Sequence, residues 1–125
     1  MDNKATVDEL KEEVQMFCEE RDWDQFHNPK DLAIGVSTEA GELLDIFRFK
    51  TEAQMKELFE NPKSKEHIEE EVADILFFLL RFAQMNHLDL SECIHNKIQK
   101  NSKKYPVETA KGNNLKYAEV KETKL

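Results

Sequence analysis

Residues 71–83 read EVADILFFLLRFA, and this stretch decides the fold. Between Val72 and Ala83 it is apolar almost all round, interrupted only by Asp74 and Arg81. A helix that is apolar on every side belongs at the centre of a protein, so we expect a central helix here. Its apolar surface exceeds what a lone bundle of this size needs. We therefore expect a homodimer or a homotetramer that completes the core.

Outside this stretch, caps and apolar periodicity predict four more helices. With their caps included, the five expected helices cover about residues 6–20, 28–49, 51–60, 64–86 and 89–104. Their expected N-caps are Thr6, Asn28, Thr51, Ser64 and Asp89. No segment shows a convincing period of two, so the expected fold class is an all-α bundle of about five helices. We expect a single domain over residues 1–125, in which 106–125 form an irregular C-terminal tail.

The composition argues against several classes of protein. The net charge is −8, whereas a general nucleic-acid binder is usually basic. The longest apolar run, from Ile75 to Leu80, is too short to span a bilayer. The N-terminus MDNKATVDEL has no apolar segment of a secretory signal, and Cys18 and Cys93 lack metal-type spacing. We therefore expect a cytoplasmic protein that binds neither nucleic acid nor membrane.

An acidic side chain interrupts the apolar seam of the expected second helix. The seam advances in steps of 4, 3, 4 and 3 residues through Leu32, Val36, Glu39, Leu43 and Ile46. An apolar residue is expected at position 39 of such a seam, yet the residue is Glu39. Glu42 lies one turn further on, about 60° toward the edge of the seam. Two carboxylates therefore project from the same side of the core face.

The central helix repeats this arrangement. Its seam passes through Ile68, Val72, Ile75, Leu79 and Phe82. Glu71 lies about 40° from Ile75 around the helix, and Asp74 lies about 100° from it. Because the helix is apolar around Asp74, we expect this carboxylate to be shielded from water.

Four carboxylates in or beside a core are costly unless something neutralises them. An unpaired buried carboxylate costs several kcal/mol, and neighbouring carboxylates also repel one another. Oxygen ligands without His or Cys suit a hard cation, Mg²⁺ or Mn²⁺, better than zinc. Mg²⁺ held by few protein ligands bridges to substrate phosphates. The pattern therefore indicates metal-assisted phosphoryl or nucleotidyl transfer.

Three other interpretations stay open at this point. In the first, the carboxylates are solvated surface charges or members of buried salt bridges. In the second, the chain is a non-catalytic helical interaction or regulatory module with a structural divalent cation. The third, a di-iron bundle, needs two Glu-x-x-His pairs on facing helices, and the chain has one, from Glu92 to His95.

The four carboxylates also match a family signature. Glu39-Ala-Gly-Glu42 and Glu71-Val-Ala-Asp74, with 28 residues between Glu42 and Glu71, resemble the E-x-x-E and E-x-x-D motifs of the MazG-like all-α nucleotide pyrophosphohydrolases. The flanking segments FCEERDWDQFHNP (17–29), FRFK (47–50) and KIQKNSKKYP (97–106) look like the dCTP pyrophosphatase branch of that family. The resemblance covers roughly residues 7–120, which is nearly the whole chain.

This resemblance implies an activity and a metal site. The activity is Mg²⁺-dependent cleavage of a nucleoside triphosphate to the monophosphate and pyrophosphate, with Mn²⁺ as an alternative cation. The implied metal ligands and catalytic residues are Glu39, Glu42, Glu71 and Asp74, and one of them or Glu70 would deprotonate the attacking water. The implied role is the removal of non-standard or excess (deoxy)nucleoside triphosphates from the nucleotide pool.

The resemblance also implies substrate contacts. Lys97, Asn101 and Tyr105 match positions that contact phosphate or sugar, and His27 matches a position near the base. Residues 97, 101 and 105 share one helix face by their spacing, as an exposed basic stripe also does. His27 is equally typical of a packed loop histidine. Trp23 and its neighbour at position 26 more often anchor a loop than stack on a base.

Two aromatic residues depart from the family pattern. Phe49 stands where the dCTP-cleaving branch tends to have Trp, and Phe78 stands where it tends to have Tyr. Phe78 lies one turn beyond Asp74 on the same side of the helix, where a nucleobase is expected. Each phenylalanine lacks the hydrogen-bonding group of the residue it replaces. Because a site without such groups discriminates poorly between bases, specificity for cytosine is in doubt.

Overall fold

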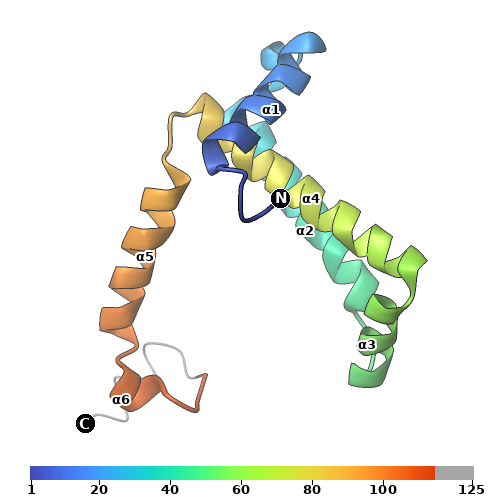
Figure 1. Cartoon of the computed structure of the whole chain (residues 1–125), viewed down its shortest axis with the longest axis vertical. Helices are drawn as coiled ribbons and strands as arrows, with labels where there is room; N and C mark the ends of the chain where they lie inside the picture. Colours follow the sequence, from blue (N-terminus) through green and yellow to red (C-terminus); the bar gives the residue numbers. More distant parts are fainter. Residues whose placement is uncertain (115–125) are drawn as a thin grey trace. The chain divides into compact units, whose positions relative to one another are not determined.

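The computed structural model describes residues 1–114, which form helices joined by short connections (Figure 1). The elements are α1 (Val7–Glu20), the 3₁₀ turn η1 (Asp24–Phe26), α2 (Pro29–Phe47), α3 (Glu52–Glu60), α4 (Pro62–Met85), α5 (Leu90–Lys104) and α6 (Val107–Ala110). The described residues contain no β-strand, so the expected all-α fold class is confirmed. The chain divides into two units, Met1–Leu88 and a second unit that begins at Asp89.

Most helices begin at the caps that the sequence predicts. The side chains of Thr6, Asn28, Thr51 and Asp89 each accept a hydrogen bond from the backbone N–H three residues further on. At Thr51 the contact is reciprocal, because the Gln54 side chain accepts a hydrogen bond from the Thr51 N–H at 2.8 Å. These local contacts explain why α1, α2, α3 and α5 start where they do.

The start of α4 differs from the expectation. The helix begins at Pro62, because the Asn61 side chain accepts hydrogen bonds from the N–H groups of Lys63 and Ser64 and Pro62 suits the first helical position. The hydroxyl of Ser64, the expected cap, instead donates to the Leu58 carbonyl oxygen at 2.5 Å. This bond ties the first turn of α4 to α3.

The ends of α2 and of the chain also differ from the expectation. α2 ends at Phe47 instead of Phe49, and Phe49 adopts a left-handed backbone conformation with φ of 63°, which no α-helix accommodates. The expected irregular tail begins with the short helix α6 (Val107–Ala110). Residues 115–125 of that tail lie outside the described part of the chain.

The core of the first unit forms where α1, α2 and α3 pack on α4 (Figure 1). The buried apolar side chains are Val14 and Cys18 from α1, Leu32 from α2, and Ile68, Leu80 and Ala83 from α4. α4 is therefore the central helix of this unit, as its apolar composition predicts.

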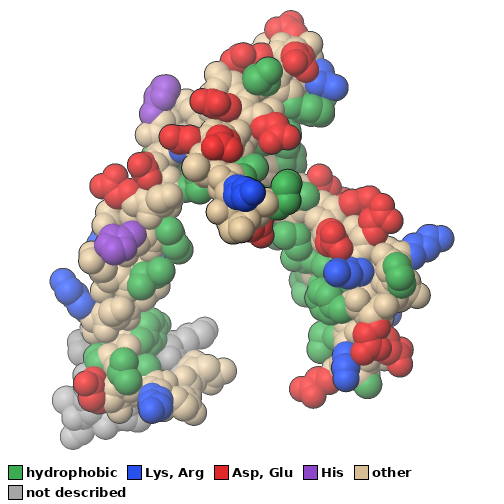
Figure 2. Space-filling model, viewed as in Figure 1, with side chains coloured by type: hydrophobic (Ala, Val, Ile, Leu, Met, Phe, Trp, Pro, Cys, Tyr) green, Lys and Arg blue, Asp and Glu red, His purple; other side chains and the backbone are tan. Residues whose placement is uncertain are grey.

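Part of the predicted seam is not covered by the chain itself. Val72 is 48% exposed and Leu79 is 43% exposed, although periodicity places both in the seam of α4. Other exposed apolar side chains of this unit include Ile34, Leu44, Phe59 and Leu76. Figure 2 shows apolar side chains at the surface among acidic ones. The homo-oligomer expected from the sequence stays a prediction. Among the described helices, none combines the length and the apolarity needed to cross a bilayer.

Candidate functional site

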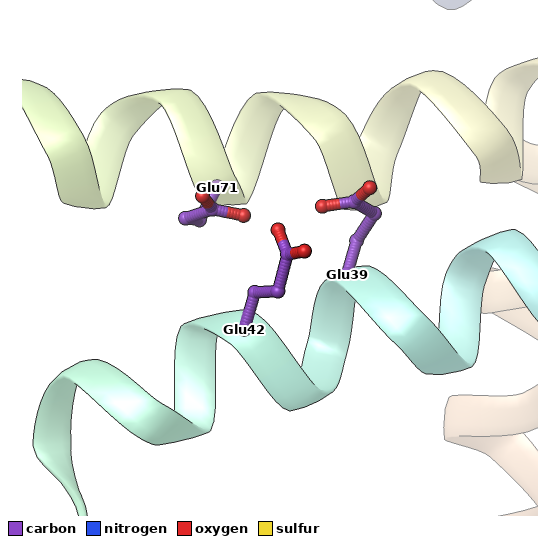
Figure 3. Close-up of side chains that lie close together, drawn as sticks. All are labelled: Glu39, Glu42 and Glu71. Atoms are coloured by element: carbon purple, nitrogen blue, oxygen red, sulfur yellow. The ribbon is translucent and has the colours of Figure 1, made fainter.

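Three carboxylates from two helices converge in the first unit (Figure 3). Glu39 and Glu42 come from α2 and Glu71 comes from α4, and each offers an oxygen that lies within 4.8 Å of the other two. The three-residue spacing of Glu39 and Glu42 puts both on one side of α2, and that side faces α4 because the two helices pack along each other. We refer to Glu39, Glu42 and Glu71 as the carboxylate cluster.

Two oxygens of this cluster are buried without a partner. Glu39 Oε2 and Glu71 Oε2 are shielded from solvent and neither has a hydrogen-bond partner. The other oxygen of Glu71, Oε1, lies 3.4 Å from His67 Nε2, one turn earlier in α4. Glu42 is exposed. An orphaned buried acceptor in a folded protein indicates a missing ligand or a functional group held under strain.

The electrostatics of the cluster favour protonation. The pKa of Glu39 is raised to about 7, first by the hydrogen-bonding side chain of Glu42, then by burial and by the charges of Glu42 and Asp74. The pKa of Glu71 is raised as well. Here burial is the main cause, followed by the hydrogen bond and the charge of Glu42. The cluster therefore keeps a proton to higher pH than an ordinary glutamate does.

Asp74 lies beside the cluster rather than in it. Its negative charge contributes to the raised pKa values of Glu39 and Glu71, and it lines a cavity together with Glu39. The expectation that Asp74 is shielded is wrong for the isolated chain, because its side of α4 is not covered and Asp74 is exposed. On α4 it is Glu71 that carries a buried oxygen.

An aromatic cavity of about 580 Å³ opens next to these carboxylates. Helices α1, α2 and α4 and the loop before α2 contribute to its walls, and its lining includes Phe17, Trp23, Phe77, Phe78, Glu39 and Asp74. The rings pack edge to face: Phe17 with Trp23 at 5.5 Å and with Phe77 at 5.8 Å, and Phe77 with Phe78 at 5.6 Å between centroids. The cavity and the carboxylate cluster share Glu39.

Of the two aromatic positions that depart from the family pattern, only Phe78 is part of the cavity lining. Phe78 lines the cavity, and its ring packs against Gly35 of α2. Phe49 follows the end of α2, is 91% exposed and has the Arg48 guanidinium 4.7 Å from its ring centroid. No role was predicted from the sequence for Phe17 or Phe77. Phe17 begins the family-like segment 17–29, and Phe77 belongs to the apolar stretch of α4.

His27 lies in a hydrogen-bond network instead of the cavity lining. Its Nδ1 accepts a hydrogen bond from Arg81 Nε at 2.9 Å. Burial lowers the pKa of His27, and the neighbouring Arg81 charge lowers it further. Its imidazole also packs edge-on against Trp23, with ring centroids 6.1 Å apart. The structure thus connects His27 to the cavity through Trp23.

Lys97 and Asn101 lie on α5, and Tyr105 is the C-cap residue of that helix, in the second unit of the chain. Lys97 is exposed, Asn101 is half-buried and Tyr105 is 36% exposed, and the Tyr105 N–H donates to the Asn101 carbonyl oxygen at 2.8 Å where the helix ends. A role for these residues toward the carboxylates stays a prediction.

Comparison with known proteins identifies the family of the chain. Residues 34–120 match the MazG-like family. The dCTP pyrophosphatase 1 of Rattus norvegicus is 32% identical over 117 residues, which is 94% of this chain and 69% of that protein. The human protein of the same name is 30% identical over 117 residues, which again is 94% of this chain and 69% of that protein. The crystal structure of a pyrophosphatase from Archaeoglobus fulgidus has 35% sequence identity and a TM-score of 0.74, and the match covers 80% of this chain and 92% of that one.

The family match spans most of the chain, and it includes Glu39, Glu42, Glu71 and Asp74. The resemblance seen in the sequence motifs is confirmed by these relatives. The chain therefore belongs to the MazG-like family, on its dCTP pyrophosphatase-like branch, and it is an enzyme of the hydrolase class.

Proposed function

We propose that this enzyme is a Mg²⁺-dependent nucleoside triphosphate pyrophosphohydrolase. In the proposed reaction, water cleaves the anhydride bond between the α- and β-phosphates of a (deoxy)nucleoside triphosphate and releases the monophosphate and pyrophosphate. The observation that supports this most is the pair of buried, unpartnered oxygens of Glu39 and Glu71. Such oxygens are costly in a folded protein unless a ligand compensates them.

The donor set of the carboxylate cluster fits a hard cation. Glu39, Glu42 and Glu71 offer oxygens within 4.8 Å of one another, and Asp74 is close enough to shift the pKa of two of them. Oxygen donors without sulfur favour Mg²⁺ or Mn²⁺. A cation bound by these residues would neutralise phosphate charge and lower the pKa of water.

The aromatic cavity is the proposed binding site for the nucleobase. Bases stack on aromatic side chains, and Phe17, Trp23, Phe77 and Phe78 supply four rings. Since Glu39 belongs to both the cavity wall and the carboxylate cluster, a base in this cavity leaves its phosphates near the carboxylates. The protein's own part in the reaction is thus to bind the base and to orient the triphosphate toward the cluster.

The proposed substrate range is broad. The named relatives act on dCTP by their names, and we propose that this enzyme accepts dCTP among several (deoxy)nucleoside triphosphates. Three of the four aromatic side chains in the cavity are phenylalanines, which discriminate bases weakly because they form no hydrogen bond.

We also propose that Lys97, Asn101 and Tyr105 contact phosphate or sugar in a homodimer or homotetramer, and that the enzyme removes excess or non-standard nucleotides.

Pyrophosphate release from a panel of nucleoside triphosphates tests this function. The panel is assayed with Mg²⁺, with Mn²⁺ and with EDTA, for the wild type and for Glu71→Gln. We expect metal-dependent release by the wild type and a loss of at least about a hundredfold in the variant. The matched control is Glu69→Gln, an exposed glutamate on the same helix that has no part in the cluster. Folded wild-type protein that releases no pyrophosphate from any nucleotide with either metal would refute the proposal.

A further inference from the structure

A buried arginine connects the central helix to the loop before α2. Arg81 of α4 is 1% exposed. Its three guanidinium nitrogens each have a different partner: Nε donates to His27 Nδ1 at 2.9 Å, one terminal nitrogen donates to the Gln84 side-chain oxygen at 2.6 Å, and the other donates to an Asp24 carboxylate oxygen. Two of these partners, Asp24 and His27, belong to the loop, and both follow its tryptophan, Trp23, in the sequence.

The loop has few other contacts with the rest of the unit. Residues 21–26 are exposed, η1 buries no side chain, and η1 has no side-chain cap. Most of the loop's hydrogen bonds run within the loop itself or to the last turn of α1, as with Trp23 N–H to the Cys18 carbonyl oxygen at 3.0 Å. The hydrogen bonds from Arg81 to Asp24 and His27 therefore hold the loop on α4.

Trp23 links this network to the cavity. Its indole lines the cavity and packs edge-on against two rings. The ring centroids are 5.5 Å apart for Phe17 and 6.1 Å apart for His27. His27 in turn is held by Arg81. Because Nδ1 accepts the hydrogen bond from Arg81, the neutral imidazole carries its proton on Nε2. A contiguous path of contacts thus joins a buried charge on α4 to one wall of the cavity.

We propose that Arg81 is a positioning residue that fixes Trp23 as a preformed wall of the nucleobase cavity. This inference rests on the proposed function, because it assigns the cavity to the base. It extends that proposal, since Arg81 lines neither the cavity nor the carboxylate cluster and acts through His27 and Asp24. A wall held before the substrate arrives lowers the ordering cost of binding.

The arrangement requires the shape of arginine as well as its charge. Lysine has one nitrogen at the end of a flexible chain and does not reproduce three divergent hydrogen bonds from one plane. Methionine fills similar apolar volume without any of them. Arg81→Lys therefore keeps the charge without the three-way connection, and Arg81→Met keeps only the packing.

The single tryptophan of the chain makes the proposal measurable without an activity assay. Trp23 fluorescence and its quenching by acrylamide are recorded for the wild type, Arg81→Lys, Arg81→Met and Asp24→Ala, with far-UV circular dichroism as the check of folding. We expect red-shifted emission and about a twofold higher quenching constant in both Arg81 variants, and a smaller change in the same direction for Asp24→Ala. The control is Arg48→Met, which removes an exposed arginine at the C-cap of α2 whose ion pair is with Asp45.

Kinetics with the best substrate of the panel completes the test. We expect KM to rise about tenfold in Arg81→Lys while kcat stays within about threefold, because the change affects base binding and leaves the carboxylates in place. Mn²⁺ binding should be unchanged. Folded Arg81 variants with wild-type quenching and wild-type KM would overturn the proposal. If an Arg81 variant does not fold, Asp24→Ala and His27→Ala provide the same readouts. A wild type without activity would refute the proposed function, while the quenching data would still decide whether Arg81 positions Trp23.

Discussion

Replacing Glu39 by glutamine should stabilise the metal-free protein. Glu39 Oε2 is buried without a hydrogen-bond partner, and its pKa is raised to about 7 by Glu42, by burial and by Asp74. Above about pH 7 the folded wild type therefore carries a second negative charge next to that of Glu42. Glutamine has the same shape and no charge, and its amide can donate a hydrogen bond to the Glu42 carboxylate.

The size of the effect follows from the separation of the carboxylates. Ligand oxygens of Glu39 and Glu42 lie within 4.8 Å of each other, and two unit charges at that distance repel by about 0.9 kcal/mol in a water-like dielectric. We use this solvent-screened value because Glu42 is exposed. A gain of about 1 kcal/mol raises the melting temperature by roughly 3–6 °C for a domain of this size.

Thermal unfolding in EDTA, followed by circular dichroism at about pH 8 and about pH 5.5, measures this gain. The folded-state pKa of Glu39 lies above its unfolded value, so the folded wild type binds more protons between the ordinary value of 4.5 and about 7 and loses stability as pH rises through that window. The advantage of Glu39→Gln should therefore be present at the higher pH and small at the lower one. Glu69→Gln is the charge-matched control. A Glu39→Gln protein that is clearly less stable at the higher pH would refute the reasoning and favour a buried salt bridge.

Three further predictions use other features of the molecule. Mg²⁺ binding by the wild type should tighten as pH rises through about 7 and should release protons, because Glu39 must lose its proton to bind the cation. Calorimetry in buffers of different ionisation enthalpy measures this proton release. Binding that does not depend on pH would contradict the prediction. Gly35→Ala should be less stable than Gly41→Ala by about 1–3 kcal/mol in urea titrations, since a Cβ at Gly35 meets three ring atoms of Phe78 at 2.6–2.8 Å, whereas a Cβ at Gly41 meets nothing within 4 Å. Equal stability of the two variants would show that Phe78 yields freely. The pKa of His27 is lowered by burial and by Arg81, so the unfolded chain binds more protons just below the ordinary value of 6.5 and stability should fall as pH decreases through that value. In His27→Gln this part of the pH dependence of stability should disappear. Urea unfolding midpoints measured against pH test this, and a variant whose midpoints change with pH as the wild type's do would assign the effect to another group.

The carboxylate cluster was predictable because helical spacing converts sequence directly into a shared face. Glu39 interrupts an apolar seam, and Glu42 and Glu71 follow from the same periodicity. The position of Asp74 was less predictable. Its apolar neighbours suggested burial. Burial depends, however, on which faces of α4 other helices cover, and the periodicity of α4 alone does not reveal which faces these are. Val72 and Leu79 are exposed for the same reason.

Contacts between distant segments were the least predictable part. The cap at Asn61 was missed because two residues near the start of α4 are good caps, and the interaction of Ser64 with α3 decides between them. Arg81 stood out in the sequence as a charge within an apolar helix, but two of its three partners are 54 and 57 residues away along the chain. The cavity combines side chains of α1, α2 and α4. No local pattern encodes such a combination.

The carboxylate cluster and the cavity walls belong to different kinds of structure. Glu39, Glu42 and Glu71 stand within long helices that pack along each other, so their spacing is fixed by the backbone of the fold. Trp23, by contrast, belongs to a short exposed loop that is held by a few side-chain bonds. Under the proposed function, mutations in that loop would alter which nucleobase fits while the carboxylate oxygens keep their places. Substrate choice would then evolve separately from the chemistry at the carboxylates.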